Sequence, residues 1–287
     1  MSAVVTDREW EAHRLSDAIG VEIRGMDLSR VLDAPDVDAL HRLFDDHGLL
    51  LFRDQDLSES DQVRLCSALR PVVDPVAWVS NVTAGFHPEG ELLWHSDYAF
   101  TAHPMLGLSL FAIEIAPDAA PTRFANSARA YDLLPDGLRN GLRELRVVHC
   151  IDSVHGRDNV RTRLDEAGGT NASESSFPRY ARPAIWEHPI TGRPLLFILE
   201  QQASHFEGLT CDESNALLDA AFAVLYDPSN VYEHMWSPGD LVVWDNLTLQ
   251  HGRPGNPRPV RRSLRRGAMN AVTTSELIAG TGFDPRV

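Results

Sequence analysis

The sequence predicts a mainly β protein with flanking helices, in the class of β-sandwiches and barrels. From about Val76 onward, short β-type segments alternate with turn residues over most of the chain. Before that point, apolar residues at helical spacing indicate helices that would pack on the β core. A length of 287 residues and a hydrophobic fraction of 43% suit one domain with a sizeable core, so we take residues 1–287 as a single domain.

The N-terminal quarter of the chain predicts two strands and two helices in alternation. Ile19–Arg24 is a short strand, and the helix after it should end at Gly48. Leu49–Arg53 is a second, strongly apolar strand. Ser58 and Asp61 have the spacing of a capping box, which predicts the start of the second helix.

The rest of the chain predicts a series of short strands with two helices between them. The helices begin near Ser127 and at Thr210, where Glu213 completes a capping box. The expected strands are Ala77–Asn81, Leu92–Phe100, Leu106–Ile115, Leu145–Ile151, Leu195–Leu199, Asp240–Trp244 and Ser263–Met269. Asp152–Arg182, in contrast, is polar and lacks periodicity. We expect this segment to be a lid, with a solvated surface insertion as the alternative.

Charge and cysteine content narrow the possible partners and the compartment. The formal net charge of −15 should repel nucleic-acid phosphates. The three cysteines lack C-x-x-C spacing, which favours buried free thiols over disulfides or a zinc site. The N-terminus shows no signal-peptide pattern, and no apolar run is long enough to cross a bilayer. We therefore predict a soluble cytoplasmic protein with a small-molecule partner and no membrane or nucleic-acid partner.

His95 and Asp97 form an H-x-D pair in a segment expected to be a strand. Residues two apart on a strand point to the same face, so both side chains would enter one cavity. One imidazole nitrogen and one carboxylate oxygen are two of the three ligands in the facial site of non-haem iron(II) enzymes. H-x-D is also a frequent chance motif, and a hydrogen-bonded pair on a strand is the alternative.

His251 follows the buried strand that Pro238-Gly239-Asp240 introduces, far along the chain from the H-x-D pair. It is the candidate third ligand, and a turn histidine at a strand end is its alternative. Four arginines follow within 261–266, of which Arg262 and Arg266 share one strand face. A buried guanidinium needs an anion, and the distal carboxylate of 2-oxoglutarate would satisfy one of them. A solvated basic stretch is the alternative.

In order and spacing, these motifs resemble the taurine dioxygenase and 2,4-dichlorophenoxyacetate dioxygenase (TauD/TfdA) family of iron(II)- and 2-oxoglutarate-dependent oxygenases. The likeness extends from about Ile19 to Ala271. The segments that carry it are Ile19–Leu28, His47–Gln55, Leu93–Asp97, His188–Arg193, Pro238–Asp240, Trp244–Asn246, His251 and the paired arginines. Each segment is weak alone, whereas their order and spacing together are specific.

The resemblance implies a double-stranded β-helix, which is a jelly roll with a cupin-like core. It implies that His95, Asp97 and His251 bind iron(II), with 2-oxoglutarate and O₂ as co-substrates. Arg262 would hold the distal carboxylate of 2-oxoglutarate, and Thr122 would donate a hydrogen bond to the same group. Family members are commonly oligomeric, which implies a homo-oligomer.

The expected activity is hydroxylation of an unactivated C–H bond in a small organic acid or amino-acid-derived metabolite. Arg266 matches a second family arginine, and a substrate anion would neutralise it once Arg262 is assigned to 2-oxoglutarate. An internal acid or 2-oxoglutarate itself is the alternative partner of Arg266. Asp97 favours oxygenation over halogenation, because halogenating relatives lack the carboxylate ligand. Phe197–Glu200 and the residues before Thr122 depart from the usual family segments.

Other functions stay open at this point. The same cofactors could support desaturation, cyclisation or epimerisation of a natural-product intermediate. A metalloenzyme that uses no keto acid would leave the paired arginines and Thr122 without an anion. A catalytically inactive β-helix binding protein and a lectin-like sandwich would both lack keto-acid turnover. Decarboxylation of 2-oxoglutarate in the absence of substrate would separate these functions from an oxygenase.

Overall fold

The computed structural model describes residues 3–4, 9–82, 90–151, 160–161, 178–255 and 260–281. Most of the segment predicted as a lid, 152–182, lies outside these ranges, so that prediction stays untested. At its C-terminal end the prediction of a loop is wrong, because Arg179–Pro183 forms strand β10 and pairs with β9 (Arg146–Cys150). The strand forms there because Arg182 is buried, with its guanidinium 4.3 Å from the Trp186 ring centroid.

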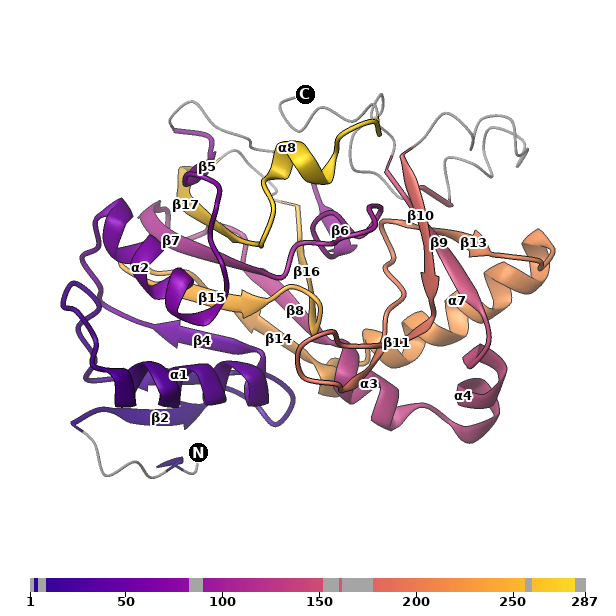
Figure 1. Cartoon of the computed structure of the whole chain (residues 1–287), viewed down its shortest axis with the longest axis horizontal. Helices are drawn as coiled ribbons and strands as arrows, with labels where there is room; N and C mark the ends of the chain where they lie inside the picture. Colours follow the sequence, from indigo (N-terminus) through magenta and orange to yellow (C-terminus); the bar gives the residue numbers. More distant parts are fainter. Residues whose placement is uncertain are drawn as a thin grey trace.

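Two β-sheets enclose the main core of the molecule (Figure 1). The larger sheet has eight strands in the order β1-β2-β3-β4-β15-β7-β17-β5, and the smaller has four in the order β14-β8-β16-β6. The larger sheet consists of β1 (Ala3–Val4), β2 (Glu11–Arg14), β3 (Val21–Arg24), β4 (Leu49–Phe52), β5 (Ala77–Ser80), β7 (Gly107–Ile115), β15 (Leu241–Asp245) and β17 (Arg262–Met269). The smaller sheet consists of β6 (Leu92–His95), β8 (Thr122–Asn126), β14 (Val231–His234) and β16 (Leu249–Arg253). This arrangement confirms the predicted double-stranded β-helix with flanking helices.

Short sheets and helices cover the two main sheets. The remaining described strands are β9 and β10 with β13 (Ala203–Phe206), and the pair β11 (Ile185–Glu187) and β12 (Pro194–Leu196). The described helices are α1 (Ala34–His47), α2 (Glu59–Leu69), α3 (Ser127–Leu133), α4 (Asp136–Leu142), α7 (Cys211–Leu225), α8 (Thr274–Leu277) and the 3-10 turn η1 (Pro228–Asn230). Figure 1 places α1 and α2 at one end of the molecule and α4 and α7 at the other. None of these helices combines the length and the apolar character that a membrane span requires.

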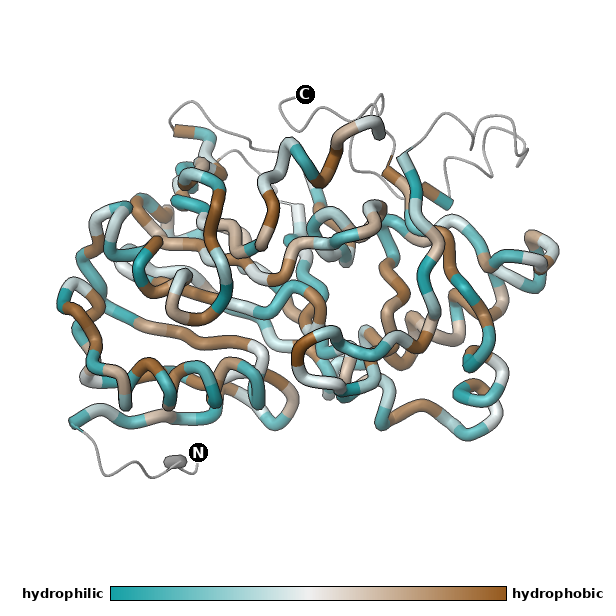
Figure 2. Tube along the Cα trace, viewed as in Figure 1, coloured by the Kyte–Doolittle hydropathy of each residue, from teal (hydrophilic) through white to brown (hydrophobic). Residues whose placement is uncertain are grey.

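The central strand β4 explains why part of the sequence is continuously apolar. Leu49 and Leu51 face the core between the two sheets, whereas Leu50 and Phe52 pack beneath α1 and α2. Both faces are covered, so the strand does not alternate between apolar and polar residues. Figure 2 shows this strand as a nearly unbroken hydrophobic segment. As predicted, α1 ends at Gly48, whose φ of 73° lies in the left-handed region.

Several predicted boundaries need correction. The strand expected over Leu92–Phe100 ends at His95, because the chain turns at Asp97 and Tyr98 takes a φ of 61°. The strand expected over Leu195–Leu199 ends at Leu196. Among the cysteines, Cys66 and Cys150 are buried free thiols as predicted, but Cys211 is exposed, because it begins α7 at the surface.

Candidate active site

His95 and Asp97 come together by a route different from the predicted one. Because β6 ends at His95 and Asp97 lies in the following turn, strand parity does not place the pair. Instead, Asn246 holds the turn: its Oδ1 accepts from Asp97 N at 3.0 Å, and its Nδ2 donates to Asp97 O at 3.1 Å. Gln202 binds the backbone of Ser96 in the same way, at 3.4 and 3.1 Å. Side-chain amides from distant parts of the chain therefore fix the segment between the two candidate ligands.

His251 lies within a strand, where the sequence had placed it beyond one. It sits in β16 directly opposite His95 of β6, and the two ring centroids are 4.2 Å apart. Oδ1 of Asp97 lies 3.6 Å from His95 Nε2 and 3.8 Å from His251 Nε2. Each of the three residues offers a ligand atom within 4.8 Å of the others, and they form a possible metal-binding group in the described part of the chain.

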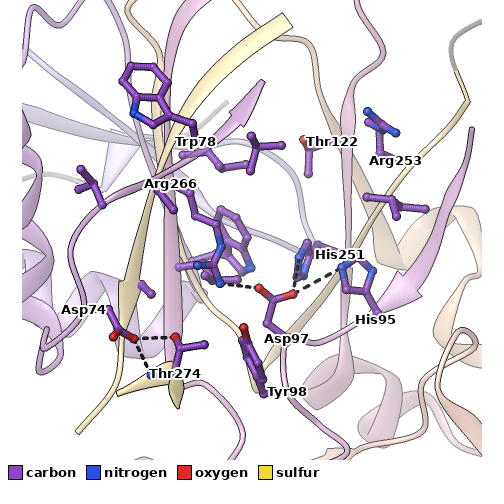
Figure 3. A pocket seen from close by; sticks show the side chains of 18 of the residues that line it. Asp74, Trp78, His95, Asp97, Tyr98, Thr122, His251, Arg253, Arg266 and Thr274 are labelled. Atoms are coloured by element: carbon purple, nitrogen blue, oxygen red, sulfur yellow. Dashed lines mark hydrogen bonds and ion pairs between the residues drawn. The ribbon is translucent and has the colours of Figure 1, made fainter. Parts of the chain in front are cut away.

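The donor set of this cluster fits a divalent first-row metal. The Nδ1–H of His95 donates to the carbonyl oxygen of Leu93 at 2.7 Å, which leaves the Nε2 lone pair facing Asp97. Oδ2 of Asp97 accepts from Arg266 Nη2 at 2.6 Å, so Oδ1 is the oxygen directed toward the imidazoles (Figure 3). Two nitrogens and one oxygen on one side of an ion leave further coordination positions open, as in the facial sites of iron(II) oxygenases.

Thr122 and Arg262 line the same cavity as the three candidate ligands. The hydroxyl oxygen of Thr122 accepts from Arg262 Nη2 at 3.3 Å and from Trp236 Nε1 at 3.0 Å. Because both lone pairs are used, the hydroxyl proton remains to be donated to a ligand. The sequence did not predict β8, the strand that carries Thr122, although it did select the residue.

Arg262 is a buried cation that needs an anion. Its side chain is 2% exposed, and its Nε has no hydrogen-bond partner among the described residues. Burial and the charge of Arg253 lower the pKa of Arg262 to about 9. A carboxylate placed against Arg262 and the Thr122 hydroxyl would remove this cost, so the two residues fit the distal carboxylate of 2-oxoglutarate.

Arg266 also lines the cavity, as strand parity predicted, but it is already engaged. Its Nη2 contacts Asp97 Oδ2 at 2.6 Å and Met105 Sδ at 3.2 Å. The structure therefore provides the internal acid that the sequence left as one alternative. A guanidinium has five N–H donors, so Arg266 retains donors beyond those used at Nη2.

The cavity has a volume of about 350 Å³ and walls that are mainly apolar. Among its lining residues, Val79, Leu108, Leu110, Trp244 and Ala268 are inward-facing hydrophobic side chains of the larger sheet. At its rim, Asp74 Oδ2 accepts from the Thr274 backbone and hydroxyl at 2.8 and 2.6 Å.

A second, water-sized cavity of about 20 Å³ also touches His95 and Asp97, and Gln201 and Gln202 line it. These two glutamines, together with Asn246 and Arg253, are site residues that the sequence reasoning missed. Arg253 shares strand parity with His251, which would have been a signal if the sequence reasoning had placed His251 within a strand.

The fold and the donor set place the molecule among the non-haem iron dioxygenases that consume 2-oxoglutarate. Within that class, the chain belongs to the family described as taurine catabolism dioxygenase TauD, TfdA family, whose model matches residues 11–268. The alpha-ketoglutarate-dependent 2,4-dichlorophenoxyacetate dioxygenase of Cupriavidus pinatubonensis is 30% identical, over 87% of this chain and 93% of its own. The alpha-ketoglutarate-dependent sulfate ester dioxygenase of Pseudomonas putida is 30% identical, over 94% and 93%. A taurine dioxygenase structure from Burkholderia xenovorans has a TM-score of 0.75 at 25% identity and covers 91% of each chain.

Proposed function

We propose that this dioxygenase hydroxylates an unactivated C–H bond of a small organic acid or amino-acid-derived metabolite. His95, Asp97 and His251 hold iron(II), and Arg262 with Thr122 holds the distal carboxylate of 2-oxoglutarate. The observation that carries the proposal is one cavity of about 350 Å³ that joins a two-imidazole, one-carboxylate cluster to a buried arginine, whose Nε has no hydrogen-bond partner in the described part of the chain. When bound, iron(II) and 2-oxoglutarate supply the activation of O₂, so that R–H, O₂ and 2-oxoglutarate give R–OH, succinate and CO₂.

The protein's own residues orient these groups and keep water away. The backbone carbonyl of Leu93 fixes the His95 tautomer, and Arg266 occupies one carboxylate oxygen of Asp97, so Asp97 offers its other oxygen to the metal. Apolar side chains such as Leu108 and Leu110 exclude water from the reacting C–H bond.

The proposed acidic substrate rests on Arg266. Its remaining N–H donors can bind an anion next to Asp97, and such a contact would orient the substrate beside the metal. Relatives named for 2,4-dichlorophenoxyacetate and (S)-phenoxypropionate support a carboxylate substrate. Kinetics of Arg266→Ala test this. Substrate affinity should fall by a larger factor than substrate-free 2-oxoglutarate turnover, which should fall only to the extent that Asp97 loses its Arg266 partner; an equal fall in both, or in neither, contradicts the role.

Anaerobic spectroscopy tests the metal and co-substrate assignment. Iron(II) and 2-oxoglutarate added together should give a visible charge-transfer band. His95→Ala, Asp97→Ala and His251→Ala should each abolish the band, because loss of one ligand dismantles a facial site. A band that survives in all three variants would show that the metal binds elsewhere. A screen of small organic acids for stimulated succinate formation then identifies the substrate.

The organisation of the chain as one oxygenase domain, its assembly and its cytoplasmic location stay predictions. The family match over residues 11–268 supports treating 1–287 as one domain, which should unfold in a single cooperative transition. A homo-oligomer predicts a mass in light scattering that is a multiple of the 31.9 kDa chain.

A further inference from the structure

Arg253 is a buried arginine in the wall of the active-site cavity. It follows His251 by two positions on β16, so both side chains point to the same face of the strand. Arg253 is 4% exposed and lines the cavity with Thr122 (Figure 3), as Arg262 also does. Between the two inward residues, Gly252 allows a close approach of β6, since a Cβ there would lie 2.9 Å from Leu92 O.

The sheet register places Arg253 beside Thr122. β16 and β8 are antiparallel, with His251 opposite Phe124 and Gly252 opposite Arg123. Continuing the ladder by one residue brings Arg253 opposite Thr122, and directly opposite residues of antiparallel strands share a face. Arg253 therefore neighbours Thr122 in the cavity wall, and its Nη2 donates to the carbonyl oxygen of Gly90 at 2.9 Å.

Electrostatics also connects Arg253 with Arg262. Burial is the larger cause of the lowered pKa of Arg262, and the positive charge of Arg253 is the second cause. Two like charges kept in one water-poor wall are costly, and a carboxylate between them offsets the repulsion of both. On the outer face of β8, Arg123 pairs with Glu233 at 2.7 Å and provides a comparison arginine that lies outside the cavity.

We propose that Arg253 is a second cation for the distal carboxylate of 2-oxoglutarate, acting together with Arg262 and Thr122. The inference rests on the proposed function and extends it to co-substrate selection. Two guanidinium groups favour a 2-oxo acid with a charged tail more strongly than one does. The chain therefore discriminates against 2-oxo acids whose tail is uncharged, such as 2-oxopentanoate, by means of both arginines.

Calorimetric titration of the manganese(II)-loaded protein with 2-oxoglutarate and with 2-oxopentanoate tests this without turnover. Arg253→Gln should weaken 2-oxoglutarate about 10- to 100-fold, as expected for a lost hydrogen bond to a charged group, and should change 2-oxopentanoate little. Arg253→Lys, which keeps the charge, should recover part of the loss. Arg123→Gln, the matched variant on the outer face, should leave both affinities within about twofold.

The outcomes separate this inference from the proposed function. Equal weakening of both ligands in Arg253→Gln, or no weakening of either, overturns the role of Arg253. Failure of the unmodified protein to bind 2-oxoglutarate overturns the proposed function instead. If Arg253→Gln does not fold, Arg262→Gln provides the second test. It should keep a preference of about tenfold for the charged tail, supplied by Arg253, and the absence of any preference would contradict the inference.

Discussion

The arginines at the start of β17 occupy two contrasting environments within a few residues. Arg261 pairs with Glu114 at the surface, and Arg265 donates to Gln62 Oε1 at 2.7 Å and to the carbonyl oxygens of Leu57 and Ser58. Protein groups thus satisfy both side chains that point away from the cavity.

The two arginines on the other face of β17 line the cavity. Arg262 contacts the Thr122 hydroxyl, and its Nε has no partner among the residues that the structure describes; Arg266 contacts Asp97 beside the candidate metal site. The chemistry of the side chain is the same on both faces, so the available partner decides its role. An arginine whose donors the protein satisfies away from the cavity supports the fold, whereas one that retains donors toward the cavity marks a candidate ligand site.

The largest effect is expected for Arg262. Arg262→Ala should weaken 2-oxoglutarate by about 3–5 kcal/mol, because one member of a buried ion pair is lost, while iron(II) binding stays nearly intact. The control Arg261→Ala breaks an exposed ion pair with Glu114 and should leave both folding stability and 2-oxoglutarate affinity nearly unchanged. Anaerobic titration of the charge-transfer band measures the 2-oxoglutarate affinity of both variants. An unchanged affinity in Arg262→Ala would transfer the role to a neighbouring arginine.

The opposite behaviour is expected for Arg265, the buried arginine on the outer face. Arg265→Met should lower the free energy of unfolding by about 1–3 kcal/mol, because its hydrogen bonds connect β17 with Gln62 and Leu57 at the start of α2. Urea denaturation measures the loss, and 2-oxoglutarate affinity of the folded variant should equal that of the unmodified protein. Weakened co-substrate binding at unchanged stability would erase the distinction between the two faces.

A smaller effect is expected for the hydroxyl that supports Arg262. Thr122→Val should weaken 2-oxoglutarate by about 1–2 kcal/mol through the loss of one hydrogen bond to a charged group. Thr122→Ser retains the hydroxyl and should bind 2-oxoglutarate nearly as well. Calorimetry on the manganese(II)-loaded protein compares the two variants, and equal affinities would show that the hydroxyl takes no part in binding.

Much of this arrangement was accessible from the sequence, because local rules determine it. Strand parity correctly sorted Arg262 and Arg266 toward the cavity, and capping boxes at Ser58 and Thr210 correctly marked the starts of α2 and α7. The apolar strand predicted over Leu49–Arg53 likewise corresponds to β4, which the structure covers on both faces.

The remaining features depend on contacts between distant residues, which local patterns do not contain. Asp97 lies in a turn because the Asn246 amide, 149 positions away, binds its backbone. No periodicity near Asp97 contains that information. The prediction that His95 and Asp97 lie together was correct, but it rested on a strand that does not extend to Asp97. The pairing of Arg253 with Thr122 similarly depends on the register between β16 and β8, and β8 itself was not predicted.

Glu200 is a partly buried acid, and we expect its substitution to have the smallest effect. Burial raises the pKa of its carboxyl group above the ordinary value, and its backbone N–H donates to the Tyr226 hydroxyl at 3.1 Å. Because the folded-state pKa is the higher one, the native protein favours the protonated form. Protonated Glu200 therefore contributes fully to folding stability at a pH below the ordinary glutamate pKa. This contribution is lost as the pH rises through the pKa of Glu200 in the folded protein.

Glu200→Gln should consequently raise the melting temperature at pH 8, where the unmodified side chain is ionised. The gain should disappear as the pH falls into the range where glutamate is protonated in both states. Solvent reaches part of this side chain and screens its charge, so the effect should be modest. Scanning calorimetry at both pH values, with the exposed Glu144→Gln as the control, measures it. A gain that is equal at low and high pH would mean that the substitution acts through packing rather than charge.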